Sequence, residues 1–395
     1  WTPIIDVVNY FKLRSSYGLV GSDETGLYAG APHYLYLSNV NMYGGGNFES
    51  GVTGGLSQQG PMVNSYPVSN ASWERATEFD IGVDLQLFKQ FNFTFDWFSS
   101  KRDRILMKRA SFPSVLGYQN AIPWANVGKV DNMGFEFSAN WTKQINKDWF
   151  IDARVNWTYS RNKYVYVDEP DYPYVWQTQT GKPLDAMRGY IADGLFESQA
   201  EIDASPDQSI FGSTIMPGDI RYRDINGDNK ITAEDQVMLS PYGNMPRIQY
   251  GFGISVQWKD LDVNVFFNGS AKRNIMLTGM YPFCANDSND NNLMKWIADS
   301  HWSEGADNSN VLYPRLGTLS TQISNNNQPS SWWMRNGSFL RFKTLEIGYR
   351  LKWFRLYFSA DNLAVWSKFK YWDPELSFNS YPLQRTFNIG LQFNL

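Results

Sequence analysis

Twelve consecutive residues, 224–235, carry side-chain oxygens at a spacing suited to a calcium ion. Oxygen donors stand at positions 1, 3, 5, 9 and 12 of the stretch, and position 7 offers its backbone carbonyl, which is close to an EF-hand or dockerin loop. A hard cation needs several converging oxygens, and alternate residues of a tight loop supply them. The predicted ligands of a structural calcium ion are Asp224, Asn226, Asp228, Lys230, Thr232 and Asp235.

Two residues of this stretch depart from the calcium-loop pattern. Asn229 stands where the pattern has glycine, which is tolerable because asparagine enters the left-handed backbone region fairly readily. Asp235 stands where the pattern has glutamate, so a bidentate contact is less assured. The alternative is an Asx-rich turn held by hydrogen bonds from backbone N–H groups to side chains. The sequence leaves the occupancy of the loop open.

Aromatic residues form a second group with potential chemistry, because many of them fall in long polar segments. Flat aromatic faces stack on sugar rings or hold peptide side chains, and neighbouring amides and carboxylates, as in 286–292, supply hydrogen bonds. The alternative is that these residues pack the loops against one another, since long folded loops need small cores of their own. The predicted ligand contacts are Trp176, Trp296, Trp332, Trp333, Tyr371 and Trp372.

The sequence offers little material for catalysis. Asp168, Glu169 and Asp171, or the pair Asp373 and Glu375, resemble a glycosidase pair only in type, because the decisive separation in space cannot be read from the sequence. The two histidines, His33 and His301, have no visible activating context. The single cysteine, Cys284, excludes a disulfide framework and a thiolate zinc cluster. We therefore predict that the chain is not an enzyme.

Composition narrows the class of protein. The 395 residues are 16% aromatic but only 19% charged, below the roughly 25% of ordinary soluble domains. The net charge of -4 gives no basic surface for nucleic acid. No apolar run approaches the roughly 20 residues of a membrane helix. A transmembrane β-barrel passes this last test, because lipid-facing and lumen-facing side chains alternate along its strands.

Strict alternation is indeed the strongest pattern in the chain. Between positions 77 and 87, for example, Phe79, Ile81, Val83 and Leu85 are separated by polar residues or glycine. Such runs exceed the usual globular strand and fit the 9 to 11 residues that a tilted strand needs to cross hydrocarbon. About ten strands are predicted, at 9–19, 73–88, 91–107, 126–143, 148–165, 247–258, 260–272, 337–350, 353–365 and 385–395.

The connections between these strands alternate between short turns and long polar segments. The long ones are 20–72, 108–125, 166–246, 273–336 and 366–384, and such lengths are uncommon in compact soluble domains. Tryptophan and tyrosine cluster near the ends of the apolar bands, where an aromatic girdle lies. We expect the inward-facing charges to pair across the barrel interior; these are Asp80, Asp84, Asp152, Arg154, Glu346 and Arg350.

The fold class predicted from this pattern is all-β, an antiparallel transmembrane β-barrel with long extracellular loops at 166–246 and 273–336. The bacterial outer membrane is the expected location. The alternative is a soluble β-sandwich or jelly roll, in which the apolar faces form a shared core and the strands are shorter.

Nearly the whole chain resembles the C-terminal part of the barrel of SusC-like (SusC/RagA family) TonB-dependent outer-membrane transporters. Several short stretches carry the resemblance through their order and spacing: LRSSYG at 13–18, WE at 73–74, FDIGVD at 79–84, NVGKVDNMGFE at 126–136, GLF at 194–196, PGDIRY at 217–222 continuing to 228, GSFLR at 337–341 and SADNL at 359–363.

The resemblance implies that residues 1–395 supply about ten strands of a barrel of about 22, without its plug domain and N-terminal barrel half. It also implies active import of an oligomeric glycan or peptide, energised by TonB through the absent N-terminal part. A SusD-like surface lipoprotein would cap the barrel, and pairs of transporter and lipoprotein could dimerise. An open half-barrel in lipid would leave unpaired edges, so we expect the chain to be a fragment or one cleaved half of a longer wall.

Two other functions remain open from the sequence. One is a soluble or surface-anchored β-rich glycan-binding protein without transport activity, and the other is a passive porin. The identity of the cargo, glycan or peptide, and the oligomeric state are also undecided.

Overall fold

The structure is a computed structural model that describes residues 6–23, 34–51, 55–112, 121–277, 293–317, 320–378 and 380–393. His33, Cys284 and the amide-rich stretch 286–292 lie outside the described residues.

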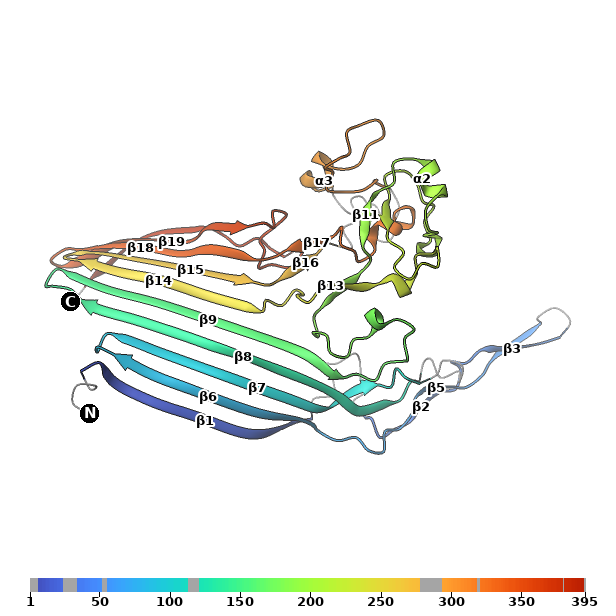
Figure 1. Cartoon of the computed structure of the whole chain (residues 1–395), viewed down its shortest axis with the longest axis horizontal. Coiled ribbons are helices and arrows are strands. Elements are labelled where there is room, and N and C mark those ends of the chain that lie inside the picture. The colour runs from blue at the N-terminus through green and yellow to red at the C-terminus, as the bar shows by residue number, and fades with distance from the viewer. Residues whose placement is uncertain are drawn as a thin grey trace.

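Ten long strands form one antiparallel sheet, which we call the wall (Figure 1). Each strand pairs with its neighbours in the order of the chain, and all ten predicted strands are confirmed with ends displaced by at most three residues. The strands are β1 (Val8–Ser22), β6 (Glu74–Leu87), β7 (Phe91–Lys108), β8 (Trp124–Gln144), β9 (Trp149–Tyr166), β14 (Ile248–Trp258), β15 (Leu261–Ala271), β18 (Phe339–Arg350), β19 (Phe354–Ser367) and β20 (Thr386–Phe393).

The two faces of the wall differ in chemistry because the side-chain period of a strand is two. Residues that are paired across neighbouring strands share a face, so Val83, Phe95 and Phe137 form one apolar row. Next to it, Asp96 is paired with Gly82 and Glu136 on the other, polar face. The apolar side chains are open to the surroundings: Phe95 is 43% exposed and Leu391 is 56% exposed. The wall thus lacks a core of its own on that face.

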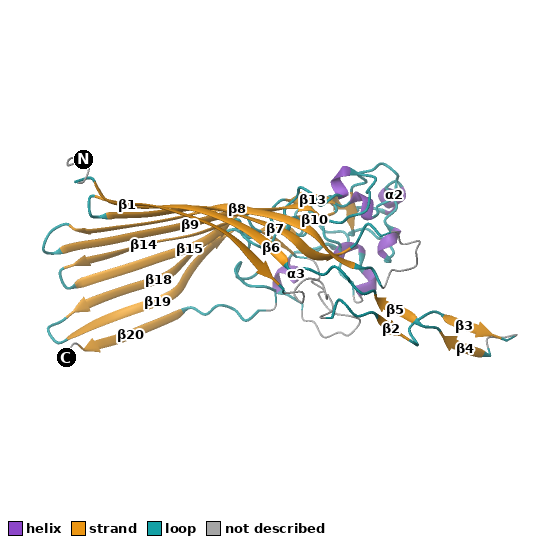
Figure 2. Ribbon diagram, turned by 90° about the horizontal axis from the view of Figure 1, so that it is seen from below, coloured by secondary structure: helices purple, strands orange, loops and turns teal. Residues whose placement is uncertain are grey.

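Short turns lie together at one end of the wall, and the long segments leave from the other end (Figures 1 and 2). In the turn between β6 and β7, Phe88 and Lys89 both have positive φ, at 51° and 56°, which matches the twist of a tight hairpin. Aromatic rings gather beside these turns: Trp149 stacks on Trp258 with ring centroids 5.8 Å apart. This arrangement agrees with the predicted aromatic girdle.

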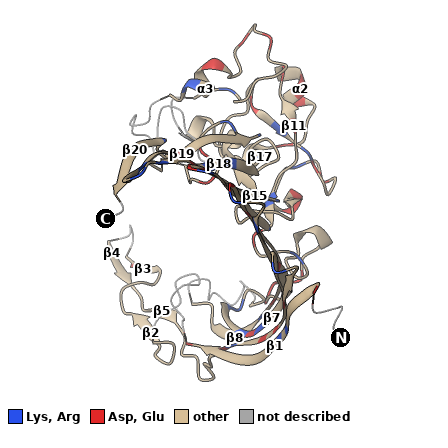
Figure 3. Cartoon of the chain, turned by 90° about the vertical axis from the view of Figure 1, so that its left-hand side faces the viewer, with Lys and Arg blue, Asp and Glu red and all other residues tan. Residues whose placement is uncertain are grey.

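Seen along its strands, the wall is curved and open rather than a closed ring (Figure 3). Among the described residues, β1 pairs only with β6, and β20 pairs only with β19. Helices α2 (Gln199–Asp203) and α3 (Lys295–Asp299) lie beside the arc of strands and not over its hollow. None of the helices among the described residues is long and apolar enough to cross a membrane.

The segment between β1 and β6 extends from the wall as two short ribbons. The first pairs β2 (Asn39–Asn41) with β5 (Met62–Ser65), and the second pairs β3 (Asn47–Ser50) with β4 (Leu56–Gln59). The apolar side chains of Val40 and Phe48 are exposed, and those of Met62 and Val63 are half-buried.

Three of the four remaining long segments fold together into a compact unit, the outer loop domain, formed by the described residues of 167–247, 272–338 and 368–378. Its ribbons and helical turns are short: β10 (Met187–Gly189) with β13 (Val237–Ser240), β11 (Ala192–Leu195) with β12 (Ile220–Tyr222), β16 (Asn274–Met276) with β17 (Met334–Asn336), α2, α3, and the turns η2 (Val175–Gln177), η3 (Ser209–Phe211), η4 (Ala233–Asp235), η5 (Ser320–Gln322) and η6 (Asn325–Asn327).

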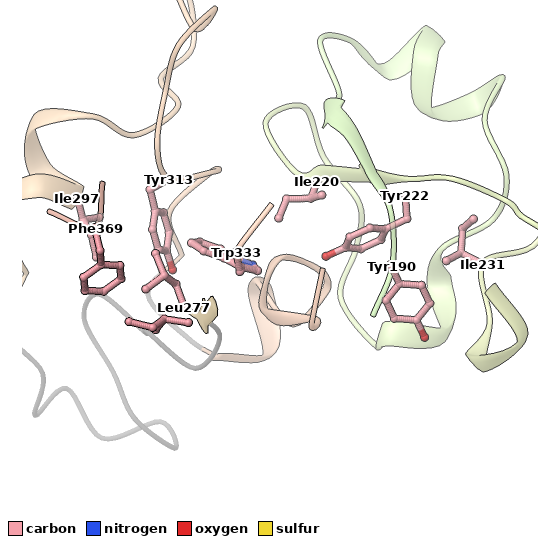
Figure 4. Packing of buried hydrophobic residues seen from close by; sticks show 10 residues of the cluster. Tyr190, Ile220, Tyr222, Ile231, Leu277, Ile297, Tyr313, Trp333 and Phe369 are labelled. Atoms are coloured by element: carbon pink, nitrogen blue, oxygen red, sulfur yellow. The ribbon is translucent and has the colours of Figure 1, made fainter. Parts of the chain in front are cut away.

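A hydrophobic core holds the outer loop domain together (Figure 4). Ile220, Ile231 and Tyr313 are fully buried there, although they come from segments far apart in the chain. The ring of Tyr313 lies edge-on to that of Trp333 with centroids 5.3 Å apart. The loops therefore have a core of the kind that a soluble domain builds.

Candidate functional site

Ion pairs cover the polar face of the wall. Arg14 of β1 donates to both carboxylate oxygens of Asp84, at 2.9 and 3.0 Å, and to Asp96 at 3.0 Å. Gly82 makes room for this group, because a Cβ at that position would lie 2.0 Å from the Asp96 carboxylate and 2.9 Å from the Arg14 guanidinium. The arginine thus ties three adjacent strands together.

A second group of this kind lies toward the C-terminal strands. Arg355 of β19 donates to Asp262 and, at 2.6 Å, to Glu346. Gly348 makes room for its side chain, because a Cβ there would lie 2.3 Å from the guanidinium. Each of the two groups joins one arginine to two carboxylates.

The inward-facing charges were predicted to pair across the barrel interior, and the contacts that the structure shows for them do not do so. Asp84 and Glu346 do form ion pairs, and Asp152 accepts hydrogen bonds from Asn140 and Thr142, but each contact joins neighbouring strands and none spans the interior. Neighbouring side chains on one face of a sheet lie about 5 Å apart, whereas opposite walls of a large barrel are several times farther. Arg154 instead lies over the ring of Phe266, at 5.1 Å from its centroid.

A pocket of about 770 Å³ opens on the polar face of β6 to β9, near the end that leads to the long segments. Its lining combines carboxylates such as Glu78 and Asp80 with the rings of Phe98 and Tyr164. The lining also includes Ser16 of β1, and a pocket that spans five strands indicates that this face is concave.

The outer loop domain is tied together by buried amides that the sequence analysis did not single out. The side-chain oxygen of Asn326 accepts from the backbone N–H of Ile220 at 2.8 Å, and its nitrogen donates to Asp219 at 2.8 Å. Arg315 donates to both oxygens of Asp219, at 2.9 and 3.1 Å. Asn325 and Asn326 are fully buried. The only sequence signal was the run of three asparagines at 325–327.

Asp235 occupies the last position of the predicted calcium loop and is fully buried. One of its carboxylate oxygens accepts from the backbone N–H of Ile225 at 2.8 Å, and the other accepts from that of Thr232 at 2.8 Å. The carboxylate therefore closes the loop through backbone hydrogen bonds. This contact is the Asx-type alternative, and the oxygen that accepts from Ile225 also accepts from the backbone N–H of Asn226 at 3.4 Å.

Asp224, at the first position of the loop, is held in the same way. Its two oxygens accept from the backbone N–H groups of Gly227 at 2.7 Å and Asn229 at 2.8 Å. Asn229 has φ of 66°, the left-handed conformation expected for the position that glycine fills in calcium loops. Among the described residues no group of three or more His, Cys, Asp or Glu side chains converges as metal ligands. The donor set is that of an oxygen-ligand site, and calcium binding remains a prediction.

The six aromatic candidates lie in the outer loop domain, and most pack against other loop residues. Trp176 stacks on Tyr174 with centroids 4.6 Å apart and donates to the Glu234 carbonyl at 2.7 Å. Trp333 is only 1% exposed, and its indole N–H donates to the Asn326 carbonyl at 2.6 Å. Loop packing thus accounts for the positions of these two residues.

The other four candidates are half-buried. Trp296 lies edge-on to Tyr371 with centroids 4.7 Å apart, and Trp372 lies edge-on to Phe369 at the same distance. Trp332 lines a pocket. A ligand contact remains a prediction for all six.

Of the carboxylates that resembled a glycosidase pair, Asp168 and Asp373 are engaged in structural contacts, whereas Asp171 is exposed. Asp168 accepts from Arg109 at 3.0 Å and from the Ser111 hydroxyl at 2.9 Å. Burial alone would raise the pKa of Asp168, but these hydrogen bonds outweigh it and lower the pKa below its usual value. Asp373 accepts two hydrogen bonds from Arg341, at 2.7 and 2.8 Å. The lowered pKa of Asp168 is the opposite of what a general acid held protonated near neutral pH requires.

Comparison with known proteins identifies a family for nearly the whole chain. The family model described as "TonB dependent receptor-like, beta-barrel" matches residues 6–363. The TonB-dependent receptor P3 of Formosa agariphila is 24% identical over 98% of the chain and 39% of its own length. The TonB-dependent receptor SusC of Bacteroides thetaiotaomicron is also 24% identical, over 98% of the chain and 38% of its own length.

Among solved structures, the RagAB peptide importer in its "open-open" state has the same fold. The TM-score is 0.67 at 21% identity, over 99% of this chain and 40% of that chain. The chain therefore spans about two fifths of the length of the proteins that it matches.

Proposed function

The chain belongs to the TonB-dependent receptor-like β-barrel family, and we propose that it forms part of the wall and outer vestibule of an importer of oligomeric nutrients. It is an outer-membrane protein of the SusC/RagA-like group. The family consists of receptors rather than enzymes, in agreement with the prediction of no catalytic activity.

The observation that carries the proposal is the division of the wall into two faces. The apolar side chains of one face are exposed in large numbers, whereas the charges of the other face pair locally, as in Arg14 with Asp84. Lipid covers the first face without cost, and the second suits a water-filled lumen through which a polar cargo passes. A soluble β-sandwich would need a second sheet over the apolar face, and the described residues contain none.

The wall needs further strands to function in a bilayer. The outer edges of β1 and β20 would leave backbone groups without partners, each at a cost of several kcal/mol in hydrocarbon. We propose that the remaining strands and a plug domain come from other residues of the transporter. In this scheme TonB acts on that plug and the chain itself is the passive wall.

The partners and cargo belong to the same proposal. A SusD-like lipoprotein would close over the outer loop domain, and two such pairs could associate. The similar RagAB protein is named a peptide importer, and SusC is named a TonB-dependent receptor. We propose an oligomer with hydrogen-bonding groups as cargo, glycan or peptide, and calcium as a structural ion in the 224–235 loop.

Native extraction from membranes in mild detergent, followed by mass spectrometry of what co-purifies, tests the proposal. We expect a plug-containing polypeptide and a surface lipoprotein together with this chain, and a retained ligand would identify the cargo. Recovery of the chain alone in the soluble fraction would overturn the transporter wall. Uptake that survives loss of the TonB system would support the passive porin instead.

A further inference from the structure

A pocket of about 960 Å³ lies at the outer end of the molecule, between segments 193–221 and 302–315 of the outer loop domain. Figure 1 shows the segment that follows α3 beside the segment that carries α2. The contact between them is held by Arg315, whose backbone N–H donates to the Gly218 carbonyl at 2.8 Å. The walls of the pocket are thus fixed relative to each other.

The indole of Trp302 forms part of the pocket lining. It packs against Gly218, where φ is 90° and where an added Cβ would lie 2.3 Å from the indole ring. The backbone N–H of Trp302 donates to the Tyr313 carbonyl at 2.9 Å, which fixes the start of this segment. The pocket therefore contains an aromatic ring held in one position.

Trp332 adds a second indole to the lining of the pocket. Its Nε1 is buried and has no hydrogen-bond partner among the described residues. An unpaired buried N–H is rare in folded proteins and calls for an explanation. Trp332 thus lines the pocket together with Trp302, and its ring, rather than its buried N–H, is the part that attracts a cation.

Negative charge dominates the pocket lining. Five carboxylates and two guanidinium groups line it, which leaves an excess of three negative charges. Both guanidinium groups are engaged: Arg221 pairs with Glu201, and Arg315 pairs with Asp219. Neither is available to neutralise the remaining acids.

Three lining carboxylates have no basic partner among the described residues: Glu197, Glu304 and Asp307. Asp193, by contrast, is paired with Arg223. A carboxylate oxygen of Asp307 accepts the backbone N–H of Ser309 at 3.0 Å, and this hydrogen bond lowers the pKa of Asp307. Asp307 is therefore ionised at neutral pH. Glu197 and Glu304 are exposed and open to a visiting cation.

We propose that this pocket binds a cationic side chain, a guanidinium or ammonium group carried by a polypeptide. Cations are attracted to the faces of tryptophan rings, and carboxylates form charge-assisted hydrogen bonds with guanidinium and ammonium groups. An uncharged sugar also stacks on tryptophan, but it gains nothing from three unneutralised carboxylates. The cation is presented either by an imported peptide or by a protein that docks on the outer loop domain.

Binding of a labelled peptide to the complete receptor in detergent tests the proposal. The probe is a fluorescein-labelled pentapeptide of alternating glycine and arginine, and its control replaces arginine by glutamine. We expect the arginine probe to bind and the glutamine probe not to bind. The double substitution Glu304→Gln with Asp307→Asn should weaken binding about tenfold at low salt. It should also flatten the salt dependence, because fewer charges remain to be screened.

Asp299→Asn is the matched control, since Asp299 is an exposed carboxylate on α3 that does not line the pocket and pairs with Lys295. This variant should bind the arginine probe as the native receptor does. Equal affinity of the native receptor and the double variant would overturn the proposal. Displacement of the probe by an uncharged oligosaccharide such as maltohexaose, with no dependence on the two carboxylates, would favour a glycan site instead.

Two further readouts separate the sources of the cation. If cells with the double variant lose uptake of arginine peptides but not of glutamine peptides, the source is the cargo. If uptake is unchanged but the extracted receptor retains less of its surface lipoprotein, the source is a docked protein. The binding assay does not require transport, so its failure leaves the proposed import function standing.

Discussion

The wall and the outer loop domain use the same aromatic-rich composition in opposite ways. In the wall, Ile389 is 79% exposed and Phe387 is 57% exposed. In the outer loop domain, Ile220 is fully buried and Trp333 is 1% exposed. The difference follows from the solvent, because lipid covers the apolar face of a barrel while water surrounds its loops. Exposed apolar side chains in the wall are therefore a normal feature of its folded state.

Polar groups differ between the two regions as well. Arg14 and Arg355 in the wall keep part of their surface open to the lumen, and their carboxylate partners come from nearby strands of the same sheet. In the outer loop domain, Asp219 and Asn326 are fully buried and join segments 107 residues apart. The loops are thus stabilised by polar contacts that are fully buried, whereas the ion pairs of the wall stay partly open.

Loss of the buried carboxylate in the outer loop domain should have the largest effect. Asp219→Ala removes the carboxylate partner of Arg315 and leaves Asn326 with only its 3.4 Å contact to the Arg315 carbonyl, so we expect a loss of about 3–5 kcal/mol in the free energy of unfolding of the loops. Limited proteolysis of the detergent-solubilised receptor would detect loop cleavage while the strands stay intact. Asp171→Ala, an exposed loop carboxylate, is the control. Equal protease resistance of both variants would contradict a separately stabilised loop domain.

A charge on the apolar face of the wall should have the next largest effect. Ile254→Arg places a cation near the middle of β14 on the lipid side, at an expected cost of about 2–4 kcal/mol. Ser255→Arg, the next residue on the polar face, should cost far less, since water or other polar groups can solvate it. Folding yield into lipid vesicles, followed by heat-dependent migration on gels, measures both. A similar loss for the two variants would contradict the division of the faces.

Calcium should stabilise the outer loop domain and leave the wall unchanged. If the 224–235 loop binds the ion, calcium at 100 times its dissociation constant adds about 2.7 kcal/mol to the unfolding free energy of the loops. Thermal unfolding with and without a chelator measures this shift. Asp224→Ala should remove it. No shift in the native protein would leave the Asx-rich turn as the sole account of the loop.

Removing the charge of Asp168 should have the smallest effect on the free energy of unfolding, and this effect should depend on pH. Asp168→Asn weakens hydrogen bonds from Arg109 and Ser111, and we expect a loss on the order of 1 kcal/mol at neutral pH. Because the pKa of Asp168 is lowered in the folded state, its stabilising contribution is complete above the ordinary value of about 3.9 and is lost as the pH falls through the lowered value. Unfolding measured between pH 3 and 8 should show the two proteins converging only in acid.

The ten strands could be predicted because the signal for a lipid-facing strand is local. Apolar residues at every second position, as from Phe79 to Leu87, fix which face meets lipid whatever the rest of the chain does. The short turns and the aromatic rings beside them follow from the same alternation. This is why the predicted strand ends differ from the observed ends by at most three residues.

The six aromatic candidates show that a local sequence pattern does not predict whether a loop side chain is buried or lines a pocket. Trp332 and Trp333 are neighbours in the sequence, yet Trp333 is buried against Asn326 and Trp332 lines a pocket. Nothing in their immediate surroundings distinguishes them, because each position depends on partners from distant segments. The asparagines at 325 and 326 were missed for the same reason, since their role requires Ile220 and Asp219 to be close.

Alternation along the chain was thus enough to define the strands of the wall and its two faces, since the face on which each side chain lies depends only on its own strand. The pairing of charges, the core of the outer loop domain and the acidic pocket around Trp302 required the fold. Arg355 meets Asp262 across 93 residues, and Arg315 meets Asp219 across 96. Such contacts form only after distant segments have been brought together, so no local pattern encodes them.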